Sequence, residues 1–283
     1  MTRRLLICIA VALLGGCGAP DPNRQTITIK GSDTMVLLGQ RWAEVYMKKK
    51  PSTVIQVTGG GSGTGISALI NGTTQICQSS RPMKPEEKQQ VRERRNVDVH
   101  EIPVALDALA IYVNTENPIE SLTLDQASKI FRGQITNWKD VGGRDANIVL
   151  YGRENNSGTY VYFKEHVLGN ADFAERYQPL SGTAAVINAV TKDALSIGYG
   201  GIGYGENVKA VLVARDASSP PVKPTMQNVL DNSYPISRQL FWYTAGPPAG
   251  AVKEFTDWVL SPEGQEVVSE VGYYPLPPAT GSQ

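Results

Sequence analysis

Apolar positions alternate with polar ones in several short runs, and a turn and a helical pattern follow each run. Period-two alternation rich in Ile, Val and Thr predicts strands, and the longer patterns predict amphipathic helices. Strands are expected at residues 26–30, 54–58 and 147–151, with the following helices ending near residues 50, 71 and 166. This alternation is typical of an α/β fold with mainly parallel strands.

A turn rich in Gly, Ser and Thr lies between strand and helix in each of these three units. The turns are residues 31–34 (GSDT), 59–65 (GGGSGTG) and 152–159 (GRENNSGT). Ser, Thr and Asp are favoured helix N-caps, and glycine lets backbone N–H groups approach a ligand closely. Each turn by itself is consistent with a plain helix cap. Because a helix N-terminus carries partial positive charge, each turn is also a candidate anion site. Three such turns together favour an anion site.

Arg153 strengthens this interpretation of the third turn. Its guanidinium stands four residues before Ser157, Gly158 and Thr159, so it can fold back and offer two parallel donors beside the hydroxyls. The alternative is a surface arginine paired with Glu154. We expect Arg153 to contribute to the anion site.

The start of the chain has the pattern of a secretory signal peptide at residues 1–16. Two arginines precede an apolar run at residues 5–14 that is too short to span a bilayer. The segment that ends at Cys17 resembles a bacterial lipobox, in which that cysteine becomes the acylated N-terminus. A buried N-terminal helix is the alternative. We expect an exported, lipid-anchored protein that faces the periplasm or the cell exterior, with residues 17–25 as a lipidated linker.

The amino-acid composition argues against several classes of ligand. The chain has 27 Lys+Arg and 27 Asp+Glu, which argues against nucleic acid as a partner. Loss of the signal peptide removes two arginines and no acid, so the formal charge becomes −2. Two His and three Cys leave little for a metal site, and neither a metal nor a cofactor is expected. Cys77 is then the one free thiol, expected in the core rather than as a nucleophile.

Two further motifs are expected to be structural. Residues 198–203 (GYGGIG) match the dinucleotide-binding fingerprint, but no helix pattern follows and residues 207–214 predict another strand. Ser181, Gly182 and Thr183 repeat the SGT triplet without a neighbouring arginine in the sequence, which favours an ordinary helix cap.

Catalysis would need a nucleophile, a base and an orienting group. His100 ends a charged segment and His166 ends a helix pattern, so neither belongs to a Gly/Ser turn, and the sequence contains no GxSxG elbow. We therefore expect a binding protein rather than an enzyme.

At these motifs the chain resembles the PstS family of phosphate ABC transporter substrate-binding proteins, which have the type 2 periplasmic-binding-protein fold. The resemblance covers nearly the whole chain after the signal peptide. The segments that carry it are residues 31–34, 59–65, 79–82, 102–107, 122–143, 152–159, 234–238 and 260–265.

The resemblance implies two α/β lobes joined by two crossovers, with the anion bound between them. Lobe 1 would comprise residues 26–106 and 241–283, and lobe 2 residues 107–240. The resemblance also implies inorganic phosphate as the ligand, the permease subunits of an ABC transporter as partners, and a monomer.

Carried over motif by motif, the resemblance implies phosphate contacts from all three turns. They fall on Ser32, Asp33, Thr34, Ser62, Arg153, Ser157, Gly158 and Thr159.

Arg81 is a departure from the family pattern. Better-studied members carry there an Asp that is said to accept the proton of the ligand, whereas shorter members often have an arginine, as this chain does. The resemblance places Arg81 at the site instead of that Asp. Asp107 is expected to replace the missing acceptor, with Asp33 the next choice. Alternatively, Asp107 is a hinge residue or the partner of Arg81.

The expected function is extracytoplasmic capture of inorganic phosphate and its delivery to an ABC permease. A receptor for another tetrahedral oxyanion, such as sulfate, molybdate or tungstate, is one alternative. A secreted phosphate-ester hydrolase and a phosphate sensor or adhesion protein without transport are the others.

Overall fold

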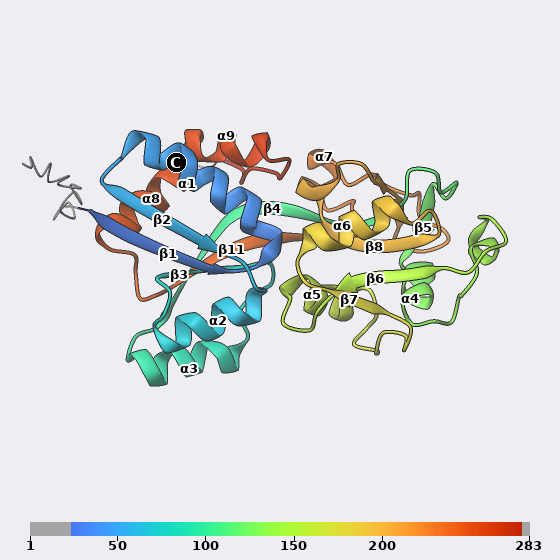
Figure 1. Cartoon of the computed structure of the whole chain (residues 1–283), viewed down its shortest axis with the longest axis horizontal. Helices are drawn as coiled ribbons and strands as arrows, with labels where there is room; N and C mark the ends of the chain where they lie inside the picture. The colour runs from blue at the N-terminus through green and yellow to red at the C-terminus, as the bar shows by residue number, and fades with distance from the viewer. Residues whose placement is uncertain (1–23, 279–283) are drawn as a thin grey trace, which may run out of the picture.

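The computed structural model describes residues 24–278, so the expected signal peptide, the lipidation site Cys17 and most of the linker lie outside it. Two α/β lobes lie side by side, and strands β4 (Val99–Val113) and β11 (Ser237–Ala245) run from one lobe into the other (Figure 1). Within residues 24–278, no helix combines the length and the apolarity needed to cross a membrane. The expected two-lobed α/β architecture with two crossovers is confirmed.

Lobe 1 is the half that begins with β1 and includes the last two helices. Its part of the sheet has the order β2-β1-β3-β11-β4, in which β1 is parallel to β2 and β3 while β11 is antiparallel to β3 and β4. Leu38, Trp42 and Tyr46 recur every four residues along α1, so one face of that helix packs onto the sheet. The elements of lobe 1 are β1 (Gln25–Gly31), α1 (Val36–Lys49), β2 (Thr53–Thr58), α2 (Ser62–Asn71), β3 (Ile76–Ser79), α3 (Pro85–Arg95), α8 (Gly250–Leu260) and α9 (Pro262–Glu270).

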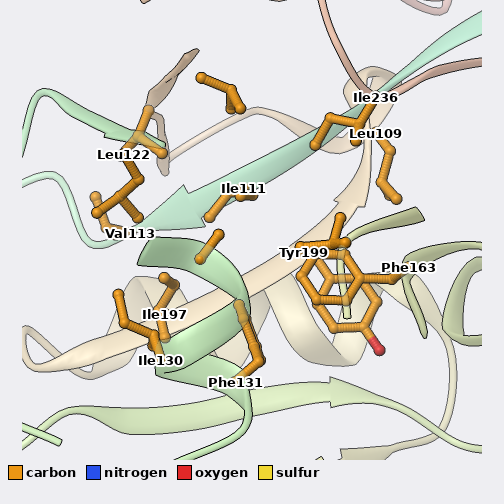
Figure 2. Packing of buried hydrophobic residues seen from close by; sticks show 14 of the residues in the cluster. Leu109, Ile111, Val113, Leu122, Ile130, Phe131, Phe163, Ile197, Tyr199 and Ile236 are labelled. Atoms are coloured by element: carbon orange, nitrogen blue, oxygen red, sulfur yellow. The ribbon is translucent and has the colours of Figure 1, made fainter. Parts of the chain in front are cut away.

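Lobe 2 continues the same sheet from β4 in the order β8-β6-β7, with these three strands parallel to one another. Its core is aromatic as well as aliphatic: the rings of Phe163 and Tyr199 stack 4.0 Å apart (Figure 2). The ring of Phe131 packs edge-on against both. The elements of lobe 2 are β5 (Ser121–Thr123), α4 (Leu124–Phe131), β6 (Val149–Arg153), α5 (Gly158–His166), β7 (Gln178–Leu180), α6 (Thr183–Lys192), β8 (Ser196–Gly201), β9 (Lys209–Ala210), β10 (Leu212–Ala214) and α7 (Met226–Leu230).

The hinge between the lobes is the antiparallel pair β4 and β11. Asp107 on β4 lies opposite Arg238 on β11 in the register of this pair. Buried apolar side chains in residues 24–278 form four clusters, of which one in lobe 1 includes Ala105 and Leu240 and one in lobe 2 includes Ala108. The expected lobe boundaries near residues 107 and 240 stay a prediction, and the change from the first of these clusters to the second falls close to them, between residues 105 and 108 on β4 and between residues 236 and 240 at the start of β11.

Some predicted elements differ from the observed ones. The third strand begins at Val149, because the N–H of Ile148 donates instead to the carbonyl of Thr136 outside the strand. The predicted strand at residues 207–214 is split into β9 and β10, which pair with β4 and β5 respectively. The GYGGIG segment is strand β8 followed by a short 3-10 turn, so the α-helix that a dinucleotide-binding fingerprint requires does not begin there.

Candidate anion-binding site

Five side-chain hydroxyls from the two lobes form a connected and buried cluster. The Oγ1 atoms of Thr34 and Thr159 lie 2.8 Å apart across the lobes. Ser32 Oγ donates to Ser80 Oγ at 2.8 Å, and Ser80 Oγ lies 3.4 Å from Ser62 Oγ and 3.3 Å from Thr159 Oγ1. None of the five residues is more than 2% exposed. Because a hydroxyl can rotate and donate, this hydroxyl cluster can turn its O–H groups toward a bound anion.

The position of each hydroxyl follows from local structure. Ser32 and Ser80 directly follow strands β1 and β3, which are parallel neighbours, so both lie at the same edge of the sheet. Thr34 lies in a 3-10 turn that leads into α1, while Ser62 and Thr159 lie in the first turns of α2 and α5. The cluster therefore collects strand ends and positive helix ends at one point.

Ser157 and Gly158 shape the lobe 2 side of the cluster. Ser157 caps α5 and accepts the N–H of Thr159 at 3.2 Å, as its place in the SGT triplet predicts. A Cβ at Gly158 would lie 2.3 Å from Ser62 Oγ and 2.9 Å from Ser80 Oγ. Only glycine therefore lets the start of α5 approach lobe 1 this closely.

Arg153 is buried beside the cluster at 1% exposure. Its Nη2 lies 2.6 Å from Asp33 Oδ2, and its Nη1 donates to Thr183 Oγ1 at 2.8 Å. Asp33 Oδ1 accepts the N–H of Gly60 at 2.7 Å. Asp33 thus joins all three Gly/Ser turns, and Arg153 Nε is left without a protein partner among the described residues.

These contacts correct one expectation and refine another. The alternative that Arg153 is a surface residue paired with Glu154 is wrong, because its partner is Asp33 from the other lobe. Residues 181–183 do form a helix cap, as expected, but they have an arginine neighbour in space that the sequence did not show. Gly182 is the N-cap of α6 at φ 84°, no side-chain cap bond forms, and Thr183 receives a hydrogen bond from Arg153. The neighbour is close in space and 30 residues away in the sequence.

Arg238 supplies a second buried guanidinium to the same cluster. Its Nε and Nη2 donate to Asp107 Oδ2 at 2.9 and 2.8 Å, and its Nη1 donates to the carbonyl of Ser80 at 2.9 Å. Its Nη2 also lies 3.1 Å from Thr159 Oγ1. The guanidinium stands over the ring of Tyr162 at 5.3 Å, which adds a cation–π contact. Arg238 thus reaches both lobes from the hinge.

The Asp107 carboxylate is fully buried, and both of its oxygens are used. Oδ1 accepts the N–H of Ile202 at 2.9 Å while Oδ2 takes the two bonds from Arg238. Burial raises the pKa of Asp107, and the charge of Arg238 and the N–H of Ile202 act in the opposite direction. Arginine keeps its proton, so the buried pair needs the carboxylate in its ionised form.

The Arg81 side chain pairs with Glu87 and not with the hydroxyl cluster. Its Nη1 and Nη2 form a bidentate pair with Glu87 on α3, at 2.8 and 2.6 Å. The alternative that Asp107 pairs with Arg81 is therefore wrong, because each of the two has its own partner. Among the described residues, the Arg81 side chain has no hydrogen bond to the hydroxyl cluster.

The structure thus brings most of the predicted residues together and adds others. Ser32, Thr34, Ser62 and Thr159 belong to the cluster, Asp33 and Arg153 lie beside it, and Ser157 and Gly158 form its lobe 2 edge. Asp107 reaches the cluster through Arg238, and Arg81 stands apart. Sequence reasoning missed Ser80, Thr183 and Arg238 as site residues. Ser80 and Arg238 lie in segments 79–82 and 234–238, which carried the family resemblance, but neither residue was itself assigned a role.

Comparison with known proteins places the chain in a family. The model of a PBP superfamily domain matches residues 18–263. The phosphate-binding protein PstS of Pseudomonas aeruginosa is 38% identical over 264 residues, which cover 87% of this chain and 82% of the relative. The chain belongs to the PstS family of the PBP superfamily. The PstS protein of Bacillus subtilis is 36% identical, with 89% of this chain and 81% of that relative covered.

Solved structures of other PstS-like receptors share the fold. A phosphate ABC transporter substrate-binding protein of Clostridium perfringens with bound phosphate matches with a TM-score of 0.81 and 32% identity, covering 89% of this chain and all of that one. An ABC-type phosphate transport receptor of Vibrio cholerae matches with a TM-score of 0.71, at the same identity and coverage. The resemblance to the PstS family, and the fold class that it implied, are therefore confirmed.

Proposed function

We propose that this PstS-family chain captures inorganic phosphate outside the cytoplasm and delivers it to an ABC permease. The observation that carries the proposal is the hydroxyl cluster between the lobes, with Arg153 on one side and Arg238 on the other. Hydroxyls and guanidinium groups are donors, and donors aimed at one point fit a small oxyanion. The names of the relatives and of the solved structures identify this oxyanion as phosphate in those proteins.

In this proposal, the hydroxyl cluster and Arg153 hold the phosphate, with Ser157 and Gly158 setting the edge of the site. We assign Asp33 to the positioning of Arg153, because each oxygen of that carboxylate already accepts a hydrogen bond. For the same reason we assign Asp107 to the positioning of Arg238 rather than to the acceptance of a ligand proton. Arg81 is given no role in binding, because Glu87 takes its guanidinium.

Calorimetric titration of the purified protein with phosphate, sulfate and molybdate tests the proposal. Phosphate is expected to bind one to one and more tightly than the other two anions. Stronger binding of sulfate or molybdate would instead indicate a receptor for that anion, and heat from none of the three would contradict an oxyanion receptor altogether.

The transport part of the proposal rests on the family and on the segment at residues 1–17. A lipid at Cys17 would tether lobe 1 and leave the hinge free, because residues 24–31 lead directly into that lobe. Palmitate labelling of wild type and Cys17→Ser, with phosphate uptake in cells that lack their own receptor, tests both points. Phosphatase activity with or without divalent metals would instead favour a hydrolase.

A further inference from the structure

Arg238 is a hinge residue that also contacts the hydroxyl cluster. Arg238 lies on a crossover strand, yet its Nη2 atom is shared between the Asp107 carboxylate and the Thr159 hydroxyl of the cluster. Its Nη1 donates to the carbonyl of Ser80, whose own hydroxyl belongs to the cluster. An anion that replaces the contacts among the hydroxyls therefore meets this guanidinium directly.

Both carboxylates near the cluster are already bonded at each of their oxygens. Asp33 accepts from Gly60 and Arg153, and Asp107 accepts from Ile202 and Arg238. The groups that remain toward the cluster are hydroxyls and guanidinium N–H groups, all of them able to donate. A site composed of such donors binds an anion more tightly when its negative charge is higher, and it does not require a proton on the ligand.

Other titratable groups around the cluster are engaged elsewhere. The phenol hydroxyls of Tyr204 and Tyr273 donate to the carbonyls of Asp33 and Thr34, and burial raises the pKa of both. Arg81 and Glu87 form their own pair. His166 stacks on Tyr162, whose ring lies under Arg238, so it is one residue removed from the cluster. Among residues 24–278, no histidine or lysine forms a hydrogen bond with the five hydroxyls.

We infer that Arg238 is a second anion-binding cation, and that together with Arg153 it selects doubly charged tetrahedral anions. This inference rests on the proposed phosphate site and names the form of the ligand that the site takes. Monohydrogen phosphate is preferred over dihydrogen phosphate, and sulfate, which is doubly charged without a proton, also binds, although more weakly.

The first test is calorimetry of wild-type protein at pH 6 and pH 8. The second ionisation of phosphate lies near neutral pH, so the share of dianion increases strongly over this interval. Apparent affinity for phosphate should increase by roughly fivefold to tenfold, because affinity scales with the fraction of the competent form. Sulfate keeps its charge over the same interval, so its affinity should change less than twofold. The sulfate arm also reports any pH dependence that comes from the protein rather than from the ligand.

The second test replaces Arg238. Arg238→Lys keeps the charge but cannot hold Asp107 and the cluster at once, and it should weaken binding of phosphate and of sulfate alike by roughly tenfold to a hundredfold. The variant Asp107→Asn/Arg238→Gln removes both charges of the buried pair together, so no lone buried charge opposes folding. It should lose affinity to a similar extent. Glu87→Gln breaks a comparable pair away from the cluster and should leave the affinity within twofold.

The outcomes separate this inference from the proposed function. Absence of phosphate binding by wild type at both pH values would contradict the proposed function itself. Phosphate binding that is equal at pH 6 and pH 8, or that excludes sulfate at millimolar concentration, would leave the function standing and overturn the inference. A folded Arg238→Lys variant with wild-type affinity would overturn it as well. The wild-type measurements decide the matter even if neither variant folds.

Discussion

Asp33 and Arg153 form an ion pair across the two lobes, with Oδ2 and Nη2 2.6 Å apart although 120 residues separate them in the sequence. The second carboxylate oxygen holds the N–H of Gly60, so the pair fixes the guanidinium relative to two turns of lobe 1. A guanidinium fixed in this way loses little side-chain entropy when an anion arrives. The pair is therefore a positioning device for the anion site.

Arg153→Ala should weaken phosphate binding by about tenfold to a hundredfold. A charge-assisted hydrogen bond contributes roughly 1.5–3 kcal/mol, and the variant loses at least one such bond to the anion. Glu154→Ala is the matched control, because this neighbour is exposed and forms no ion pair among the described residues. Calorimetry on the two variants decides: affinity within twofold of wild type for Arg153→Ala would remove this residue from the site.

Gly158→Ala should impair binding more than folding. The added methyl carbon would lie 2.3 Å from Ser62 Oγ in the other lobe, so the lobes could not approach as they do. Alanine is otherwise favourable in the first turn of a helix, so the melting temperature should change little. We expect at least a tenfold loss of phosphate affinity. Gly205→Ala is the control, since its Cβ would have no neighbour nearer than 3.3 Å. Equal affinities of the two variants would contradict the close approach.

Glu87→Gln should lower stability in a pH-dependent way. Burial by itself raises the pKa of Glu87, but the hydrogen bonds from Arg81 and from the N–H of Lys84 outweigh it, and the pKa lies below the ordinary 4.5. A carboxyl with a lowered folded-state pKa stabilises the fold above the unfolded-state pKa and loses this effect as the pH falls through the folded-state value.

The free energy of unfolding at pH 7 should therefore be about 2 kcal/mol lower in Glu87→Gln than in wild type, because a partly buried pair is broken. The difference should shrink steadily once the pH falls below about 4.5. Urea unfolding at pH 7, 5, 4 and 3 measures it. A difference that stays constant down to pH 3 would mean that the carboxylate charge does not stabilise the fold.

The sequence predicted the local units of this fold because their signals are local. The turn at residues 59–65 and the cap at Ser157 depend on residues within one helical turn, and the strands β1 and β2 are close to their expected bounds. The sequence did not predict the role of Arg238, because that role depends on the register of β4 against β11. This register places Arg238 opposite a carboxylate 131 residues earlier in the chain. Thr183 is a similar case, since its arginine neighbour comes from β6. A spatial partner leaves no spacing pattern in the sequence.

Tyr204 offers the last test, because its hydroxyl donates across the lobes to the carbonyl of Asp33 at 2.8 Å. Tyr273 donates to the next carbonyl, that of Thr34, at 2.7 Å, but from within lobe 1. Removal of one neutral hydrogen bond costs about 0.5–1.5 kcal/mol.

Tyr204→Phe removes a hydrogen bond that forms only when the lobes are in contact, so the substitution destabilises that arrangement alone. Phosphate affinity should therefore drop by roughly twofold to tenfold with little change in melting temperature. In Tyr273→Phe, the bond is lost whether or not the lobes meet. The melting temperature should therefore fall while the affinity stays within twofold. Calorimetry and thermal melting of both variants distinguish the two effects, and a larger loss of affinity in Tyr273→Phe than in Tyr204→Phe would contradict the assignment of Tyr204 to the contact between the lobes.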